Sequence, residues 1–444
     1  MIEKTVLAGN KPLESKKIPW YAVYIVILAM FGWMLVNMDS AFYVYSIPAL
    51  MSTFHLTIVN IGTISLVAYT GVFIGLYIWG PILDYFGRKT VFQLTIAFVA
   101  IFSLLSAISW SALAFTGFRF GMGAGNGGEW PAGGTMITET VGKKFRGLAM
   151  GIMQGGFQIG YLIAAVISVA LIPVYGFRSV FFVGVIPAIL IVFARLKVKE
   201  TSRYQKLKEL RKAVKENDKV TIERLKDIAR PEQVKKFTYG QLFGRDLRRR
   251  TTGLMIWSIG SGLSNSMVVL FMETYFMNSG FSYVTSALMY GIITGLSYFG
   301  YLSAGWISDY IGRRETLALY TILSALLFYL AIFPLKSLLT GIVSAGFVLW
   351  VLADAFWSGS YASIIAATTE SYPTRARGTG SGLVLGTAWL SFAVASQLSS
   401  ITIADYGYIS AWLWWAIVPL VVASFGIFVM KRVPPRKDLE EIGI

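Results

Sequence analysis

The sequence predicts an all-α integral membrane protein whose twelve transmembrane helices form two six-helix bundles. Of its 444 residues, 55% are hydrophobic and only 14% are charged, whereas a soluble protein carries about 25% charged residues. Twelve apolar stretches are each long enough to cross a hydrocarbon core of about 30 Å. Short motifs of the first half return in the second half at a nearly constant separation, which indicates two related units.

The transmembrane spans can be placed along the chain from their runs of about 20 apolar residues. In the first half we expect spans at 20–51, 57–79, 90–109, 112–138, 147–171 and 178–195. In the second half we expect them at 250–277, 283–304, 315–334, 338–366, 379–403 and 409–430. No small-residue cleavage site separates the polar stretch at 1–19 from the first span, so we expect an anchored helix and not a removed signal peptide.

One long polar insertion lies between the sixth and seventh spans. Its segment KETSRYQKLKELRKAVKEN places leucines and charges at helical spacing, and Pro231 interrupts the remainder of the insertion. We therefore expect an N-terminal six-helix bundle at 1–195, a cytoplasmic linker with short helices at 196–249, and a C-terminal six-helix bundle with a cytoplasmic tail at 250–444. A solvated charged linker without a regulatory role fits the same composition.

Lysine and arginine are confined to one side of the predicted protein. All 39 except Arg119, Arg178 and Lys336 fall in the termini, in residues 195–250, or in connections that the spans place on that same side. Positive residues favour the cytoplasmic face, so we expect a multi-pass protein of the cell membrane with both termini in the cytoplasm. Topology and attraction to anionic membrane lipids account for the net charge of +16, and nucleic acid is not expected as a partner.

The residue types that build metal and nucleophilic sites are scarce. The chain has no cysteine and a single histidine, His55, which excludes disulfides, thiolate sites and histidine-rich metal sites. No nucleophile–base pair is evident, so we expect neither an enzyme nor a bound metal or cofactor. The run GMGAGNGG at 121–128 is glycine-rich like a dinucleotide-binding loop, but it lies within an apolar span, where small residues let helices approach closely.

Two motif pairs reveal the internal repeat. GPILDYFGRK at 80–89 returns as GWISDYIGRR at 305–314. ETVGKKFRG at 139–147 returns as ESYPTRARG at 370–378. The matches occur in the same order in both halves, and the separation between the members of each pair is nearly the same. Two such units in parallel orientation are typical of secondary transporters.

These paired motifs resemble those of the major facilitator superfamily, and the likeness covers nearly the whole chain. The run from Arg119 to Gly125 resembles the RxxxGxG motif of helix four in sugar and organic-acid porters. KETSRY at 199–204 and VPPRKDLEEI at 433–442 resemble two further sugar-porter motifs. The runs GGEWPAGG and GIMQGGFQIGYLIAA resemble carboxylate porters of the lactate and sialate type. The helix-seven signatures of sugar and lactate porters are absent from the sequence.

The resemblance implies a secondary active transporter that works by alternating access and functions as a monomer. We expect proton-coupled symport of a small polar organic solute, in the first place a carboxylate such as a monocarboxylate, a sugar acid or an aromatic acid. Two alternatives stay open, namely a proton-coupled sugar transporter and a non-transporting membrane sensor on the same scaffold. The expected partners are therefore the small-molecule substrate, protons and membrane lipids.

The resemblance also implies a cytoplasmic gate, in which acids and arginines of the loops pair to close the inner side. Its residues would be Asp84, Arg88, Glu139 and Arg146 in the first half and Asp309, Arg313, Glu370 and Arg377 in the second half. Exposed pairs contribute about 0–1 kcal/mol each, and several together can shift an equilibrium between two conformations. A role in topology alone would need only the positive residues, so the acids favour a gate.

A charged side chain inside a membrane span is costly, so it normally has a partner or faces a cavity. The charged residues inside the spans are therefore the candidates for proton coupling. Asp39 in the first span and Arg119 in the fourth both fall in the outer half, where proton-coupled sugar porters pair an aspartate with this arginine. If the arginine moves away, the buried carboxylate takes up a proton. A static structural pair is the alternative. Glu129 in the fourth span is a second candidate for proton coupling, or else a substrate contact.

Polar residues at helical spacing are candidates for binding the solute. Gln154, Gln158 and Tyr161 share one face of the fifth span, and a polar stripe within lipid must face protein or water. Asn265 in the seventh span lies next to the repeat position of Asp39. These four residues are expected to line a central cavity.

Further candidates for substrate binding are Tyr43, Asp354 and Trp357, of which the aromatic residues would stack on a ring together with Trp130. For any single aromatic side chain, ordinary packing or a place in an interfacial belt is the favoured alternative. Glu273 falls near the outer end of its span, where we expect its charge to be easily hydrated.

Overall fold

The computed structural model describes residues 19–141, 145–225, 242–244, 247–333, 345–372 and 377–430, without the side chains of a few residues inside these ranges. The helices of the first half are α1 (Trp20–Tyr45), α2 (Ile47–Phe54), α3 (Ile58–Phe86), α4 (Arg88–Ala107), α5 (Ala112–Thr140), α6 (Arg146–Tyr175) and α7 (Arg178–Leu196). Two short helices, α8 (Ser202–Glu216) and α9 (Lys219–Leu225), follow where the sequence predicts them.

The second half is more segmented than the first. Its helices are α10 (Arg248–Asn265), the π-helical η4 (Ser266–Leu270), α11 (Met272–Asn278), α12 (Tyr283–Leu296), α13 (Tyr298–Ile311), α14 (Arg313–Ile332), α16 (Ala345–Ser371), α17 (Arg377–Trp412), the π-helical η5 (Leu413–Ile417) and α18 (Val418–Val429). A π-helical turn carries one extra residue and often marks a functional site.

Every predicted span corresponds to helix in the described part of the chain. Nine described stretches are long and apolar enough to cross a membrane. The remaining crossings are α5, whose charged residues make it less hydrophobic, the α12–α13 pair, which is interrupted at Ser297, and a second helix within α17–α18. That last helix begins at Gly407, whose φ of 81° bends the chain.

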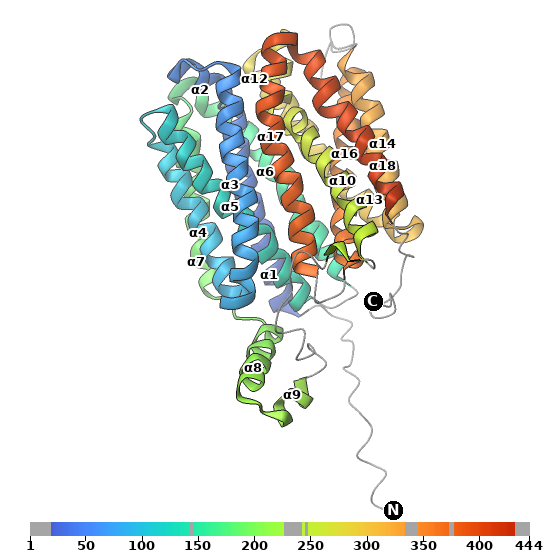
Figure 1. Ribbon diagram of the computed structural model, residues 1–444. Coiled ribbons are helices and arrows are strands. Elements are labelled where there is room, and N and C mark those ends of the chain that lie inside the picture. The colour runs from blue at the N-terminus through green and yellow to red at the C-terminus, as the bar shows by residue number, and fades with distance from the viewer. Residues whose placement is uncertain are drawn as a thin grey trace, which may run out of the picture.

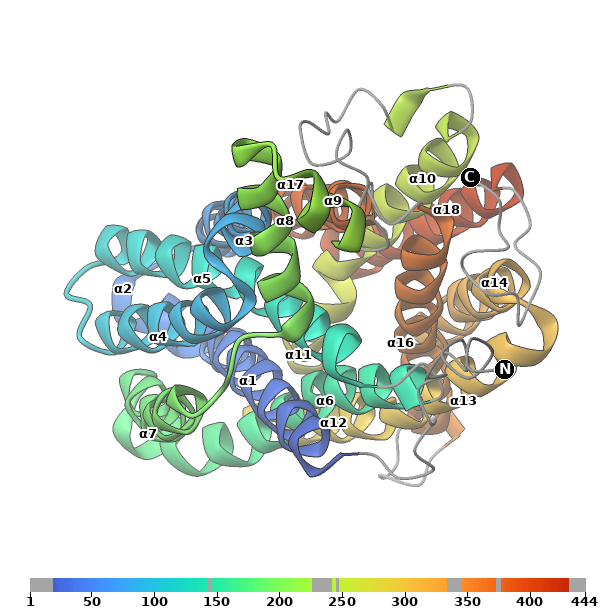
Figure 2. The same ribbon diagram turned by 90° about the horizontal axis from the view of Figure 1, so that it is seen from below.

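The helices form two bundles that stand side by side (Figure 1). Helices α8 and α9 project from one end, which we call the linker side, and α2 lies at the other end, which we call the distal side (Figure 1). Between the bundles, α3 packs on α17 and α6 packs on α12. The view along the helices shows α3 beside α17 and α6 beside α12 (Figure 2).

The two bundles touch directly on the distal side. The hydroxyl of Thr63 on α3 donates to Oε1 of Gln397 on α17 at 2.8 Å. A Cβ built at Gly62 would lie 2.0 Å from Oγ of Ser400, so the backbone of α3 lies against α17 here. The ring centroids of Tyr45 and Tyr290 are 5.8 Å apart across the same interface.

Glycines set the close packing of α3 on α5. A Cβ built at Gly123 would lie 2.2 Å from the carbonyl oxygen of Ala68, and one at Gly127 would lie 2.3 Å from that of Val72. Real side chains do not fit at such distances, so both positions require glycine. The glycine-rich run at 121–128 is therefore a helix-packing surface, as its place within an apolar span predicts.

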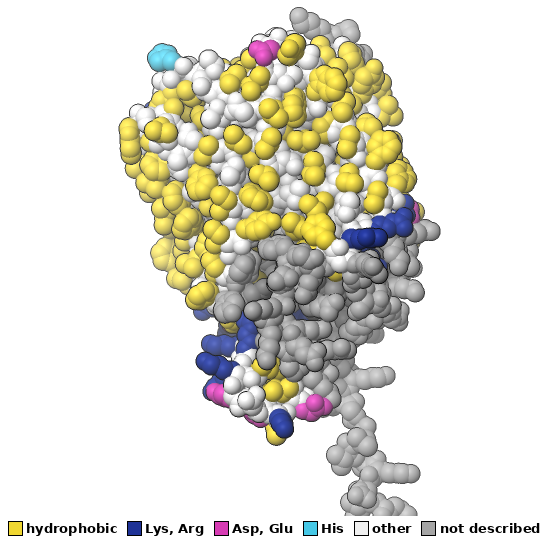
Figure 3. Space-filling model, viewed as in Figure 1, with side chains coloured by type: hydrophobic (Ala, Val, Ile, Leu, Met, Phe, Trp, Pro, Cys, Tyr) yellow, Lys and Arg dark blue, Asp and Glu magenta, His cyan; other side chains and the backbone are white. Residues whose placement is uncertain are grey.

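The surface matches a protein that spans a membrane. Apolar side chains cover the face seen in Figure 3 between its two ends, whereas described lysines and arginines gather toward the linker side. Some of these arginines bind helix C-termini: Arg314 donates to the carbonyls of Ile427 and Phe428, and Arg249 donates to that of Val429. A cation is favourable there, because the last carbonyls of a helix are unpaired and carry partial negative charge.

Candidate functional site

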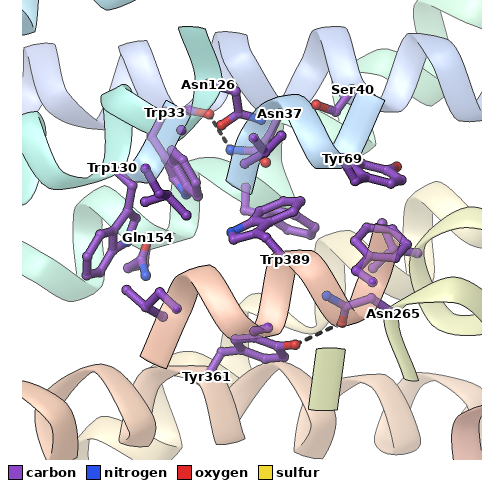
Figure 4. A pocket seen from close by; sticks show the side chains of 18 of the residues that line it. Trp33, Asn37, Ser40, Tyr69, Asn126, Trp130, Gln154, Asn265, Tyr361 and Trp389 are labelled. Carbon is purple, nitrogen blue, oxygen red and sulfur yellow. Dashed lines mark hydrogen bonds between the residues drawn. The ribbon is translucent and has the colours of Figure 1, made fainter. Parts of the chain in front are cut away.

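A pocket lies between the bundles, and helices of both halves line it (Figure 4). The space between its lining atoms is about 970 Å³, a figure that includes open solvent. Its aromatic lining residues are Trp33, Tyr69, Trp130, Phe157, Tyr161, Tyr301, Trp357, Tyr361, Trp389 and Phe392. The pocket is therefore walled by flat rings contributed from both bundles.

Side-chain amides supply much of the polar character of this pocket. They belong to Asn37, Asn126, Gln154 and Asn265 (Figure 4). Asn37 donates to the carbonyl of Trp33 at 2.6 Å, and Asn265 accepts from the hydroxyl of Tyr361 at 2.8 Å. Within the described part of the chain, Oδ1 of Asn126 and Oε1 of Gln154 have no hydrogen-bond partner. None of the described residues that line the pocket is a lysine or an arginine.

Four of the seven residues predicted to bind the solute line this pocket, namely Gln154, Tyr161, Asn265 and Trp357. The other three, Tyr43, Gln158 and Asp354, are buried but are not among its lining residues. The hydroxyl of Tyr43 forms a hydrogen bond with Oγ of Ser65 at 2.7 Å. Asp354 accepts a hydrogen bond from Ser297. Contact of these three with a solute stays a prediction.

Several pocket residues escaped the sequence analysis. Tyr69 and Phe392 come from different bundles, and their rings stack with centroids 3.9 Å apart. Nothing in an apolar span tells which way such a ring points. Asn37 and Asn126 could have been found, because the rule that a polar side chain within lipid must face protein or water applies to them as it does to Gln154.

The predicted contact between Asp39 and Arg119 is present. Both side chains are buried, and Nη1 of Arg119 donates to Oδ2 of Asp39. The hydroxyl of Ser103 on α4 donates to the other carboxylate oxygen. The guanidinium group also lies 5.3 Å from the ring centroid of Tyr43, where the π face stabilises a cation. Neither Asp39 nor Arg119 is among the residues that line the pocket, but Ser40, which follows Asp39 on α1, is one of them.

Glu129 has an arginine partner that the sequence analysis assigned elsewhere. The count of positive charges placed Arg195 with the cytoplasmic linker, but its side chain is fully buried in the N-terminal bundle. Its Nη1 donates to Oε2 of Glu129 at 2.9 Å, and its Nη2 donates to Oε1. Thr95 donates to Oε2 at 2.7 Å. Arg195 also donates to the carbonyl of Leu28, so one pair links α1, α4, α5 and α7.

Part of the predicted gate lies within the described residues. Nη2 of Arg88 is 3.3 Å from Oε1 of Glu139. Thr201, beyond α7, donates to the other oxygen of Glu139, and the carboxylate of Glu200 accepts from the backbone N–H of Arg88 at 3.2 Å. In the second half, Arg313 donates to the hydroxyl of Ser308. The side chains of Asp84, Arg146, Asp309, Glu370 and Arg377 lie outside the described part.

Glu273 differs from expectation. Its side chain is fully buried, with 0% of its surface exposed, so the expectation of an easily hydrated charge is wrong. Neither of its carboxyl oxygens has a hydrogen-bond partner in the described structure. The reason is that α11 lies inside the C-terminal bundle at this point, with Met272 and Thr274 buried on either side.

Two bundles of apolar helices with a pocket between them are the arrangement typical of a secondary transporter. The sequence model of the Major Facilitator Superfamily matches residues 25–309 and 298–442. The chain therefore belongs to the major facilitator superfamily and is a multi-pass membrane protein that binds a small-molecule substrate.

Individual relatives match most of the chain. It is 26% identical to the niacin transporter NiaP of Acinetobacter baylyi over 93% of this chain and 94% of that protein. It is 23% identical to the 4-hydroxybenzoate transporter PcaK of the same organism over 97% and 95%. The solved structure of the xylose transporter XylE from E. coli, in a partially occluded inward-open conformation, matches with a TM-score of 0.73 at 15% identity, covering 92% and 99%. At 15% identity, the likeness to XylE shows only that the two proteins share a fold.

Proposed function

We propose that this transporter carries a small aromatic carboxylate into the cell together with a proton. The observation that carries the proposal is the aromatic, amide-lined pocket between the bundles, with the buried Asp39–Arg119 pair next in the chain to its lining residue Ser40. Niacin and 4-hydroxybenzoate, which two relatives transport by name, are single aromatic rings with one carboxyl group. A ring of this size matches the flat walls of the pocket better than a chain or a lipid does.

The two bundles contribute complementary surfaces to the ring. Trp33 and Trp130 come from the N-terminal bundle, and Trp357 and Trp389 come from the C-terminal bundle. Aromatic pairs in offset or edge-to-face contact gain about 0.5–1.5 kcal/mol beyond burial of area. A bound ring that contacts both pairs favours closure of the bundles around it, which is the step that alternating access requires.

The carboxylate of the solute is proposed to bind to amide N–H groups. Asn126 and Gln154 line the pocket, and the NH₂ group of each amide offers two donors. Neutral donors hold a carboxylate less tightly than an arginine does. The weaker hold suits a site that must also release its ligand, and it leaves Arg119 committed to Asp39.

Asp39 is proposed to bind the coupled proton. Paired with Arg119, its carboxylate stays ionised, and withdrawal of the arginine during the conformational change makes protonation favourable. A monoanion carried with one proton moves no net charge, so the pH difference drives accumulation. That driving force is about 1.4 kcal/mol, or tenfold accumulation, per pH unit. Glu129 remains the second candidate, with Arg195 as the partner it would exchange for a proton.

The linker side is proposed to face the cytoplasm, because positive residues concentrate there. Both termini would then lie inside the cell, and the parts at 1–195, 196–249 and 250–444 would be the N-terminal bundle, the cytoplasmic linker and the C-terminal bundle with its tail. The Arg88–Glu139 pair, with Glu200 and Thr201, would close the cytoplasmic side in one conformation and separate in the other.

Uptake by proteoliposomes tests this function. The purified protein is supplied with labelled nicotinate, 4-hydroxybenzoate, lactate, gluconate or glucose, with and without an inward proton gradient. We expect accumulation of one of the two aromatic acids, which a protonophore abolishes. Accumulation of glucose alone would support the sugar alternative, and absence of flux for every solute would support the sensor; either result would overturn the proposal.

A further inference from the structure

Glu273, in the first turn of α11, is a buried acid for which the proposed transport cycle has no role. Its carboxyl oxygens have no hydrogen-bond partner among the described residues, and none of the described cations pairs with it. A bare carboxylate in such surroundings is strongly disfavoured, because it has lost its water and gained no partner. Burial without a partner therefore favours the neutral, protonated form of Glu273.

The groups that face Glu273 come from both bundles. Its carboxyl group interacts electrostatically with the hydroxyls of Tyr45 on α1, Tyr283 on α12 and Tyr408 beyond the kink of α17. Two neighbouring tyrosines are engaged elsewhere, because Tyr275 donates to the carbonyl of Ile332 and Tyr290 donates to that of Val269. The surroundings thus contain phenolic hydroxyls and no described charge.

Tyr45 places Glu273 at the distal contact between the bundles. It belongs to the N-terminal bundle, where its hydroxyl donates to the carbonyl of Tyr161 at 3.4 Å, and its ring packs against Tyr290 of the C-terminal bundle. Tyr290 in turn donates to the carbonyl of Val269, four residues before Glu273. Separation of the bundles on the distal side would therefore break a contact that reaches the helical run that carries Glu273.

The same helical run connects Glu273 to the pocket. Asn265 at the end of α10 and Val269 in η4 line the pocket, and Glu273 follows at the start of α11. The π-helical η4 separates the two regular segments, which allows α11 to tilt relative to α10. A change at Glu273 is thus positioned to reach the solute site through a short, irregular stretch of helix.

We propose that Glu273 is a second proton-binding site, which controls opening of the distal side. The inference rests on the alternating-access cycle of the proposed function but not on the identity of the solute. A proton from external water binds to a carboxylate oxygen while the distal side is open. The neutral carboxyl group can then be buried without water when the bundles close on that side. Loss of that proton to the same external water leaves a carboxylate that needs hydration and holds the distal side open. This proton regulates the cycle and is not transported.

Cysteine accessibility tests the proposal without any solute, since the natural chain contains no cysteine. Ser400→Cys reports distal opening, because Ser400 is buried where α17 meets Gly62 of α3. Ser52→Cys, at an exposed distal position, corrects for the pH dependence of thiol reactivity itself. The measurement is the ratio of their rates of reaction with a membrane-impermeant maleimide, from pH 5.5 to pH 8.0. We expect this ratio to rise with pH, by at most about tenfold per unit for one proton.

Variants of Glu273 decide the source of that rise. Glu273→Gln and Glu273→Leu, two neutral replacements, are expected to give a low ratio that does not change with pH. Glu273→Asp is expected to keep the rise, as is Asp354→Asn, which alters a buried acid that has a hydrogen-bond partner. The series is repeated with Asp39→Asn, so that protonation of Asp39 is not the source of the signal.

Either of two results would overturn the proposal. The labelling ratio does not rise with pH in the parent protein, or it still rises with pH in a neutral variant of Glu273 that folds. Failure of aromatic acid uptake would refute the proposed function but would leave these labelling ratios unchanged, so the two failures are distinguishable.

Discussion

The two bundles descend from one repeat, yet they hold their buried acids in opposite ways. In the N-terminal bundle, Asp39 pairs with Arg119 and Glu129 pairs with Arg195. In the C-terminal bundle, Asp354 accepts a hydrogen bond from Ser297, and Glu273 has no partner in the described structure. Neither acid of the C-terminal bundle forms an ion pair with a described residue. An arginine partner favours the charged form of an acid, whereas burial without a cation disfavours it.

The repeat positions show how this difference arises. When the halves are aligned on their loop motifs, Asp39 corresponds to Ser264 and Arg119 corresponds to Trp350. Ser264 accepts a hydrogen bond from Trp357 at 3.1 Å, and Trp350 packs against Trp412 with centroids 5.0 Å apart. A serine that binds a tryptophan and a packed tryptophan thus stand where the N-terminal bundle has its ion pair. At these two positions one bundle carries charge and the other carries aromatic packing, while both bundles contribute rings to the pocket.

Breaking the Glu129–Arg195 pair gives the largest expected effect. Arg195→Leu leaves a carboxylate buried without its cation, which typically costs about 3–5 kcal/mol of unfolding free energy. The double variant Glu129→Gln with Arg195→Leu removes both charges, so we expect most of the loss to be restored. Denaturant unfolding in detergent micelles measures both. Equal losses in the single and double variants would show that the pair acts through packing and not through charge.

Neutralising one acid in each bundle tests which bundle carries the transported proton. Asp39→Asn is expected to lower gradient-driven accumulation at least tenfold while solute exchange persists, because the protonated and ionised states no longer differ. Asp354→Asn keeps an acceptor for Ser297 and is expected to leave accumulation dependent on the proton gradient, whatever its effect on the KM of the solute. Parallel uptake and exchange assays in proteoliposomes provide the measurement. Accumulation that survives in Asp39→Asn would remove the charge-based distinction between the bundles.

The sequence is sufficient for the fold because membrane spans carry strong local signals. A run of about 20 apolar residues has few other uses, and the repeated loop motifs fix the two-bundle arrangement. The break between α12 and α13 at Ser297 and the π-helical segments leave no such signal, since tertiary packing decides them. The Asp39–Arg119 contact is predictable because Arg119 matches a family motif and Asp39 falls where proton-coupled sugar porters place the partner of that arginine.

The site is only partly predictable, for reasons that particular residues make plain. Arg195 ends its span and counts as a linker charge, but its long side chain turns back to reach Glu129. Three tryptophans lie in apolar spans, and nothing in the surrounding sequence tells which of them faces the pocket, the core or the surface. Trp389 lines the pocket, Trp350 is buried in the core, and Trp414 is 64% exposed on the surface. Only the three-dimensional arrangement distinguishes them.

These tryptophans allow the aromatic role of the C-terminal bundle to be measured. Trp389→Leu removes a ring from the pocket, and a contact of about 0.5–1.5 kcal/mol corresponds to an increase of about two- to tenfold in KM for an aromatic acid. Trp414→Leu, at an exposed surface position, is the matched control and is expected to leave KM unchanged. Concentration-dependent uptake gives both values. An unchanged KM in Trp389→Leu would argue that the solute does not contact this wall.

The smallest expected effect concerns the turns that both bundles share. Gly87 and Gly312 adopt the same backbone, with φ of 104° and 106°, at the start of α4 and α14. Glu200 adds a negative charge at the start of α4, where its carboxylate accepts from the backbone N–H of Arg88. A charge in this position stabilises a helix N-terminus by about 0.3–1 kcal/mol. Glu200→Gln is therefore expected to lower the unfolding free energy by that amount.

Salt separates this electrostatic effect from loss of packing. Interactions of exposed charges weaken as ionic strength rises, so the loss in Glu200→Gln is expected to shrink in 1 M salt. Glu216→Gln, which removes an exposed carboxylate paired with Lys212 on α8, is the matched control and should change stability less. A loss that is independent of salt would mean that Glu200 fixes the loop through its shape, and the two turns would then differ in contacts and not in charge.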